Sequence, residues 1–148
     1  DAVKAHAAAI KPQSACYERY GSRGYAALEH TCRYARDKGM TVVLDGKRGD
    51  IGISAQHYAA SAVALGAHAV TINGYLGPSS VEPYLKAGLG VFILVRTSNP
   101  DSDAFQSKRL QSGETVAELM AEVVASLGSS HVGACGLSNV GAVVESGE

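Results

Sequence analysis

Five short apolar segments, separated by stretches with helical spacing, constrain the fold of this chain more than any other feature of its sequence. The apolar residues within each segment follow one another without regular polar alternation, which is typical of strands that are covered on both faces. We predict strands over residues 8–11, 41–45, 69–73, 91–96 and 141–144.

Patterns typical of helices fill the gaps between these segments. After Ser22, apolar side chains recur three and four residues apart from Tyr25 to Ala35, and Lys38-Gly39 is a stop signal. An Ala-rich helix is expected over residues 55–65. Strands that alternate with helices form parallel sheets joined by right-handed crossovers, so we predict an α/β protein with a parallel sheet.

Two stretches have the spacing of a capping box, in which a serine or threonine precedes a glutamate by three positions. They join Ser79 to Glu82 and Thr115 to Glu118. Apolar residues recur at helical spacing after Thr115, and we expect this stripe to face the core. The stripe consists of Val116, Leu119, Met120, Val123, Val124 and Leu127.

Two architectures are compatible with this order of elements. A doubly wound domain with five strands is about as long as this chain. A (β/α)8 barrel has roughly 250 residues, or about 31 per unit, so 148 residues would hold nearly five of its eight units. The sequence shows no internal boundary or low-complexity tract, and we expect residues 1–148 to form a single domain or part of one.

The composition excludes several classes of protein. Lys and Arg number 13 against 14 Asp and Glu, a formal charge of −1, and no basic cluster suggests nucleic-acid or membrane-surface binding. The sequence shows no phosphate-binding glycine loop and no serine-hydrolase elbow, and we expect neither a membrane span nor a secretory signal. The three cysteines and five histidines lack ligand spacing, so no metal is expected. We expect a soluble, cytoplasmic protein.

Charged residues follow two of the predicted strands at their carboxyl ends, where the chemistry of parallel sheets collects. Asp45 ends the second apolar segment, and burying its carboxylate is costly unless the carboxylate is paired. Lys47 stands two residues further, so in extended chain it points the same way. Lys11 ends the first segment and can reach the same pocket. With Asp50, the pattern predicts a cluster of alternating charges, although D-x-K-x-x-D alone is also common in solvated turns.

Four segments at strand ends resemble, in order, motifs of the orotidine 5′-phosphate decarboxylase family. The signature D-x-K-x-x-D-I lies within residues 43–52, and the Lys-Pro-Gln of residues 11–13 is similar to a segment of the bacterial type 2 branch. Residues 71–77, Thr-Ile-Asn-Gly-Tyr-Leu-Gly, resemble T-x-N-P-Y-L-G, with Gly74 in place of the usual proline. Residues 97–100 match the turn T-S-N-P.

This resemblance implies a (β/α)8 TIM barrel, of which the chain would carry about five βα units, strands two to six. The family barrel opens with a strand that carries an aspartate and closes with strands whose loops hold the substrate phosphate. Neither part has a counterpart among the matched segments, and residues 144–148 differ from the expected V-V-G-A-T. We therefore expect a partial TIM barrel.

The resemblance also implies an activity, the cofactor-free decarboxylation of orotidine 5′-monophosphate to uridine 5′-monophosphate in pyrimidine biosynthesis. Lys47 would donate the proton to C6 of the pyrimidine, and Asp45 would lie near the substrate carboxylate. Lys11 would complete the charge array and bind the ribose hydroxyls. Asn73 and Ser98 would bind substrate, Ser98 at the edge of the pyrimidine.

A neighbouring segment implies an oligomer. Asp50, Ile51 and Ser54 are similar to the segment that in this family crosses into the partner subunit's site. We therefore expect a homodimer with shared active sites.

Two alternatives stay open on the sequence. One is a metal-dependent relative on the same scaffold, 3-hexulose-6-phosphate synthase, which shares D-x-K-x-x-D. The other is a non-catalytic, five-stranded α/β binding module. Ile51 after the second aspartate, Lys-Pro-Gln and Thr-Ser-Asn-Pro all favour the decarboxylase.

Overall fold

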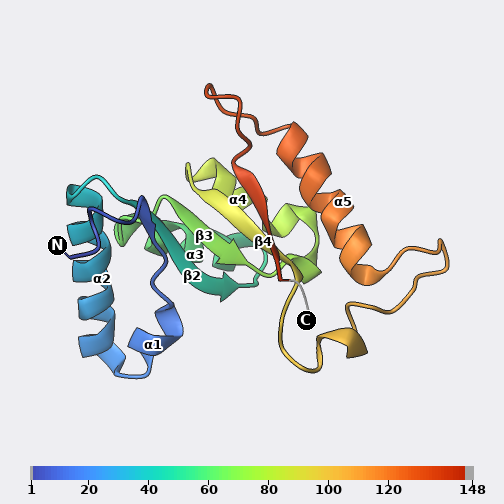
Figure 1. Cartoon of the computed structure of the whole chain (residues 1–148), viewed down its shortest axis with the longest axis horizontal. Coiled ribbons are helices and arrows are strands. Elements are labelled where there is room, and N and C mark those ends of the chain that lie inside the picture. Colours follow the sequence, from blue (N-terminus) through green and yellow to red (C-terminus); the bar gives the residue numbers. More distant parts are fainter. Residues whose placement is uncertain (1, 146–148) are drawn as a thin grey trace.

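The computed structural model describes residues 2–145, and its centre is a parallel sheet of five strands in sequential order (Figure 1). The strands are β1 (Ala9–Ile10), β2 (Thr41–Arg48), β3 (Ala69–Ile72), β4 (Gly90–Arg96) and β5 (Val140–Val144). All five predicted strands are confirmed, with β2 extending three residues further. Strand order reverses in a doubly wound sheet but not in a barrel, so the chain forms an incomplete (β/α)8 barrel.

Helices follow the strands in alternation, as the sequence predicts. They are α1 (Ser14–Glu18), α2 (Gly21–Asp37), α3 (Gly52–Ala64), α4 (Glu82–Lys86) and α5 (Val116–Ser129). In Figure 1, α2 lies beside the edge of the sheet near β2, and α5 lies beside the opposite edge near β4 and β5. A long loop between β4 and α5 extends away from the sheet on that side.

The core lies between the sheet and the helices that cover its outer face. Leu28 and Cys32 of α2 are fully buried with Val42 of β2. Ala55, Ala59 and Ala62 of α3 are almost equally buried, and their small side chains allow this helix to lie close to the sheet. Tyr84 of α4 is the largest fully buried side chain among residues 2–145. Packing in this core holds the helices against the outer face of the sheet, and the carboxyl ends of the strands are positioned by it.

The inner face of the sheet is more open than the sequence predicts. Along β4, the side chains of Val91, Ile93 and Val95 are buried, whereas Phe92 between them is 37% exposed. Continuous apolar runs suggested strands covered on both faces, and this expectation is wrong for β4 in the described residues. Its outer face packs against helices, but its inner face looks into the open side of the half-barrel.

One of the two predicted capping boxes does not form. Thr115 caps α5 as expected, since its hydroxyl accepts the backbone N–H of Glu118 and the Glu118 carboxylate accepts that of Thr115. The box from Ser79 to Glu82 is wrong, because α4 begins only at Glu82, after Val81. Residues Pro78–Ser80 instead form a 3-10 turn in which the Ser80 hydroxyl donates to the carbonyl of Gly77.

The apolar stripe of α5 is only partly covered. Val124 is buried and Leu127 is half-buried, but Leu119 is 41% exposed. Helical periodicity identifies the apolar face correctly but does not show how much of it is covered. Because α5 lies at the edge of the sheet, β4 and β5 cover one side of the stripe, while Val116 and Met120 line a cavity.

Residues 2–145 contain no helix that is both long enough and apolar enough to span a lipid bilayer.

The buried face of α2 gives a test of the fold. Truncating Leu28 to Ala removes a fully buried side chain from close-packed surroundings and should lower the free energy of unfolding by about 2–5 kcal/mol. Leu137→Ala, at a leucine that is 70% exposed, should change it by less than about 0.5 kcal/mol. Urea denaturation of the two variants measures the contrast, and equal effects would contradict the packing described here.

Candidate active site

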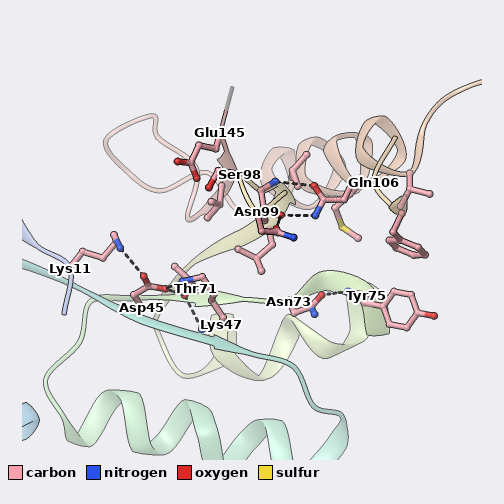
Figure 2. Close-up of a pocket in the computed structure, with 17 residues that line it drawn as sticks. Lys11, Asp45, Lys47, Thr71, Asn73, Tyr75, Ser98, Asn99, Gln106 and Glu145 are labelled. Carbon is pink, nitrogen blue, oxygen red and sulfur yellow. Dashed lines mark hydrogen bonds and ion pairs between the residues drawn. The ribbon is translucent and has the colours of Figure 1, made fainter. Parts of the chain in front are cut away.

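A cavity of about 830 Å³ opens at the carboxyl ends of the strands. Its charged side is formed by Lys11 just after β1 and by residues of β2 and β3. Its apolar side is formed by β4, β5, α5 and the loop between β4 and α5 (Figure 2). The residues that line it include Lys11, Asp45, Lys47, Thr71, Asn73, Tyr75, Leu94, Ser98, Phe105, Val116, Met120 and Glu145.

Asp45 is the centre of the charged side. Its carboxylate is 5% exposed and binds two ammonium groups, one on each oxygen. Lys11 Nζ lies 2.7 Å from Oδ2, and Lys47 Nζ lies 2.6 Å from Oδ1. Figure 2 shows both lysines pointing at this carboxylate from opposite sides. The structure thus brings together the three charged residues that the sequence placed at one edge of the sheet.

The backbone of β2 is irregular where it carries Asp45 and Lys47. Leu44 pairs with Val70 and Arg48 with Ile72, so four steps along β2 match two steps along β3, and β2 carries two extra residues in a bulge. Within it, Lys47 has φ +44°, the only positive φ at a non-glycine residue in the described chain.

The backbone of Asp45 is anchored separately. Its N–H donates to the carbonyl of Pro12 at 3.0 Å, and its carbonyl accepts the hydroxyl of buried Ser14 at 3.2 Å. Both contacts come from the segment that follows β1, which also carries Lys11. These two backbone hydrogen bonds therefore help to fix the position of the carboxylate.

Two opposing effects set the ionisation of Asp45. Burial by itself raises the pKa of its carboxyl group, but hydrogen bonds from Lys11, Lys47 and Thr71 outweigh burial and lower this pKa to about 2. Asp45 is therefore a carboxylate at neutral pH. Two ammonium groups against one carboxylate leave a surplus positive charge on this side of the cavity, which suits an anionic ligand.

The other predicted substrate-binding residues in the cavity come from the ends of β3 and β4. Asn73 lines it and caps a 3-10 turn, since its side-chain oxygen accepts the backbone N–H of Tyr75 at 3.0 Å. Ser98 lines it from the turn after β4. Five of the eight predicted site residues thus share one cavity: Lys11, Asp45, Lys47, Asn73 and Ser98.

The remaining three predicted residues lie outside the lining of this cavity. The Asp50 carboxylate accepts the backbone N–H of Ile51 at 2.8 Å, just before α3. Ile51 is 60% exposed, and Ser54 is half-buried in the first turn of α3. Within residues 2–145, none of these three residues lines the cavity that holds Lys47.

Sequence reasoning missed three residues that shape the cavity. Thr71 is a buried polar residue within an apolar strand, a pattern that requires a hydrogen-bond partner and could have drawn attention to it. Gln106 donates to the hydroxyl of Thr97 at 2.7 Å and accepts its backbone N–H at 2.9 Å, which holds the turn before Ser98. No local signal pointed to Gln106, because it lies in an irregular loop.

Tyr75 is the third residue that was missed. Its ring is 70% exposed and meets the ring of Phe105 edge-on, with the centroids 5.9 Å apart. The pair joins the loop after β3 to the loop after β4 at the rim of the cavity. An apolar rim opposite the charged side of the cavity suits a ligand with a flat ring and an anionic group.

Comparison with known proteins agrees with this geometry. The family model for orotidine 5′-phosphate decarboxylase / HUMPS matches residues 1–146. The chain belongs to this family. Among residues 2–145 no group of three or more His, Cys, Asp or Glu side chains is placed to hold a metal ion.

Curated relatives carry the family's name. The chain is 46% identical over 125 residues to the orotidine 5′-phosphate decarboxylase of Natronomonas pharaonis, a match that covers 82% of this chain and 46% of the relative. It is 43% identical over 130 residues to that of Salinispora tropica, covering 82% and 47%. The chain thus spans about half the length of the curated relatives it matches.

Solved structures share the fold. A crystal structure from Streptomyces avermitilis superposes with a TM-score of 0.85 at 40% identity, over 97% of this chain and 52% of that one. The Leishmania donovani OMP decarboxylase gives a TM-score of 0.73 at 41% identity, over 78% and 46%.

Gly74 departs from the proline of the family motif, and the structure supplies the reason. A Cβ atom at this position would lie 2.7 Å from Cγ2 of Ile93 and 2.9 Å from the sulfur of Met120. Both distances are below van der Waals contact. Because Ile93 and Met120 lie beside position 74, only glycine fits there unless these neighbouring side chains repack.

The charge array predicts a pH-dependent stability. Because folding lowers the pKa of Asp45 from 3.8 to about 2, its contribution is fully present above pH 4 and is lost as the pH falls towards 2. The shift corresponds to about 2 kcal/mol. Asp45→Asn should remove this part of the pH dependence, whereas Asp37→Asn, at an exposed position in the last turn of α2, should keep it. Denaturant unfolding at pH 2 to 6 measures the difference, and parallel curves for wild type and Asp45→Asn would contradict the array.

Proposed function

We propose that this protein decarboxylates orotidine 5′-monophosphate to uridine 5′-monophosphate without a cofactor. The observation that carries the proposal is the array Lys11–Asp45–Lys47, assembled at the strand ends of a chain that belongs to the decarboxylase family. Residues 1–148 would contribute as part of a single TIM-barrel domain in a cytoplasmic enzyme.

The chemistry required of the array is stabilisation of a carbanion. When the bond between C6 and the carboxylate breaks, carbon dioxide leaves and the electron pair stays on C6. The Lys47 ammonium attracts this developing charge, and its proton then moves to C6 to give the product. Lys47 is left neutral and regains a proton from water. Asp45 keeps Lys47 charged and oriented until then, since their charged atoms are 2.6 Å apart.

The remaining residues of the cavity would bind the rest of the substrate. Lys11 is 59% exposed beside Asp45, which leaves its ammonium group accessible to ribose hydroxyls. Ser98 would bind the edge of the pyrimidine and Asn73 would contribute a further polar contact. The apolar side of the cavity, formed in part by Leu94 and Met120, would exclude water from the reacting carbon.

A homodimer would explain the position of Asp50, Ile51 and Ser54. They lie outside the cavity of their own chain, at and just before the start of α3. We propose that they complete the site of the partner subunit. The support is the resemblance of residues 45–51 to the family signature, together with the exposure of Ile51.

Removing the proton donor tests the activity. In the protein expressed from its complete coding sequence, Lys47→Ala should lower kcat by about 10⁴-fold or more, because one positioned charge and one general acid are lost together. Lys86→Ala, which removes an exposed lysine paired with Glu82 on α4, should leave kcat unchanged. Release of carbon dioxide from the substrate is the measurement. More than a tenth of wild-type kcat in Lys47→Ala would exclude Lys47 as the donor.

Chelation separates the proposal from the metal-dependent relative. Wild-type decarboxylation should be unchanged after exhaustive treatment with EDTA. A requirement for Mg²⁺, together with synthesis of a hexulose phosphate, would instead assign the chain to the other branch of the family.

Mixing two inactive variants tests the shared site. Lys47→Ala and Asp50→Ala are each expected to be nearly inactive, but a heterodimer would hold one site with both wild-type residues. With random exchange about half of the dimers are heterodimers, so about a quarter of wild-type activity should return. Mass spectrometry of the mixture confirms the exchange. A mixture that exchanges subunits and stays inactive would show that both residues serve the same chain.

A further inference from the structure

The hydroxyl of Thr71 joins the backbone of Lys47 to the side chain of Asp45, a connection separate from the ion pair between the two side chains. Thr71 lies in β3, opposite the bulge of β2, and is 4% exposed. Its Oγ1 accepts the backbone N–H of Lys47 at 3.0 Å and donates to Oδ1 of Asp45 at 2.9 Å. Oδ1 is the same oxygen that Lys47 Nζ binds.

The direction of these two hydrogen bonds is fixed by chemistry. A backbone N–H can only donate and an ionised carboxylate can only accept, so the hydroxyl of Thr71 must accept from Lys47 and give its single proton to Asp45. These two hydrogen bonds cannot exchange their directions while Asp45 is charged. The hydroxyl therefore acts as a directional link between the backbone of Lys47 and the carboxylate of Asp45.

The bulge in β2 explains why a side chain is needed here. The two extra residues between Leu44 and Arg48 remove this stretch from the regular ladder with β3. Lys47 sits in the left-handed region at φ +44°, a conformation that costs a non-glycine residue free energy and persists only when its surroundings fix it. The hydroxyl of Thr71 supplies an acceptor for the Lys47 N–H in this irregular stretch.

We propose that Thr71 is a positioning residue, which holds the bulged backbone of Lys47 and the Asp45 carboxylate in one fixed relation and so aims the Lys47 ammonium into the cavity. This role rests on the proposed function, because it concerns the donor of that reaction. It is distinct from a role in the core, since the outer-face residues Val70 and Ile72 of the same strand fill the core.

Two substitutions separate the hydroxyl from the shape of the side chain. Thr71→Val keeps the volume and the β-branched form but leaves the Lys47 N–H and Oδ1 of Asp45 without the link. Thr71→Ser keeps the hydroxyl. Loss of a hydrogen bond to a charged group is expected to lower kcat roughly 10- to 100-fold in Thr71→Val, with KM changed less than about threefold. Thr71→Ser should keep at least about a third of wild-type kcat.

The control is Thr41→Val, the same change at an exposed residue at the other end of the neighbouring strand β2. It should leave kcat and KM unchanged. Thermal unfolding of every variant gives the temperature range in which all are folded, and kinetics are compared within that range. If Thr71→Val keeps more than a third of wild-type kcat, or if Thr71→Ser is as impaired as Thr71→Val, the proposal is overturned.

A second measurement does not depend on catalysis. The carboxyl carbon of Asp45, followed by NMR as the pH is lowered, should titrate at higher pH in Thr71→Val than in wild type and Thr71→Ser, because the valine cannot donate to the carboxylate. If wild type fails to decarboxylate the substrate, the proposed function fails, and this titration alone decides the role of Thr71. A valine variant that titrates as wild type does would overturn it.

Discussion

The buried Asp45 carboxylate needs charged and hydrogen-bonding partners, and the rest of the site supplies them. At 5% exposure, this group would be strongly disfavoured as an anion without partners. Its partners come from 34 positions earlier, at Lys11, and from 26 positions later, at Thr71. Only a sheet in which β1, β2 and β3 are parallel neighbours brings these positions to one edge. The order of the strands is therefore a requirement of the charge array as well as of the core.

The irregular backbone of β2 is the second requirement of the charge array. The N–H of Asp45 donates to the carbonyl of Pro12, after β1, whereas the N–H of Lys47 donates to the side chain of Thr71 in β3. The bulge takes residues 45–47 out of the regular ladder with β3, at the cost of a left-handed conformation at Lys47. Gly46 between Asp45 and Lys47 is half-buried beside Arg48 and Ser14. The strain is local, and the buried hydroxyl of Thr71 stabilises it from the neighbouring strand.

The sequence predicted the strands, their order of appearance and the meeting of Lys11, Asp45 and Lys47, because these depend on apolar periodicity and on where polar residues interrupt it. It did not choose between a barrel and a doubly wound sheet without the resemblance, since both have the same local patterns. The exposed part of the α5 stripe was missed for a related reason, because periodicity shows which face of a helix is apolar and not what lies against it. Thr71 looked like any β-branched strand residue until its hydroxyl was seen between two site residues.

The two sides of the cavity together suggest how the array would act on the proposed substrate. In the structure, both lysines are already bound to Asp45, so a substrate carboxylate placed beside it must compete for the same ammonium groups. The apolar side contributed by β4 and α5 limits the water that could screen this competition, which makes it stronger. In the proposed reaction, loss of carbon dioxide would remove one of the two competing anions and leave a carbanion at C6, to which Lys47 would give its proton. The same lysine that the buried aspartate holds in place is then free to give up its proton, so the pairing that stabilises the fold at this edge also directs the proposed reaction.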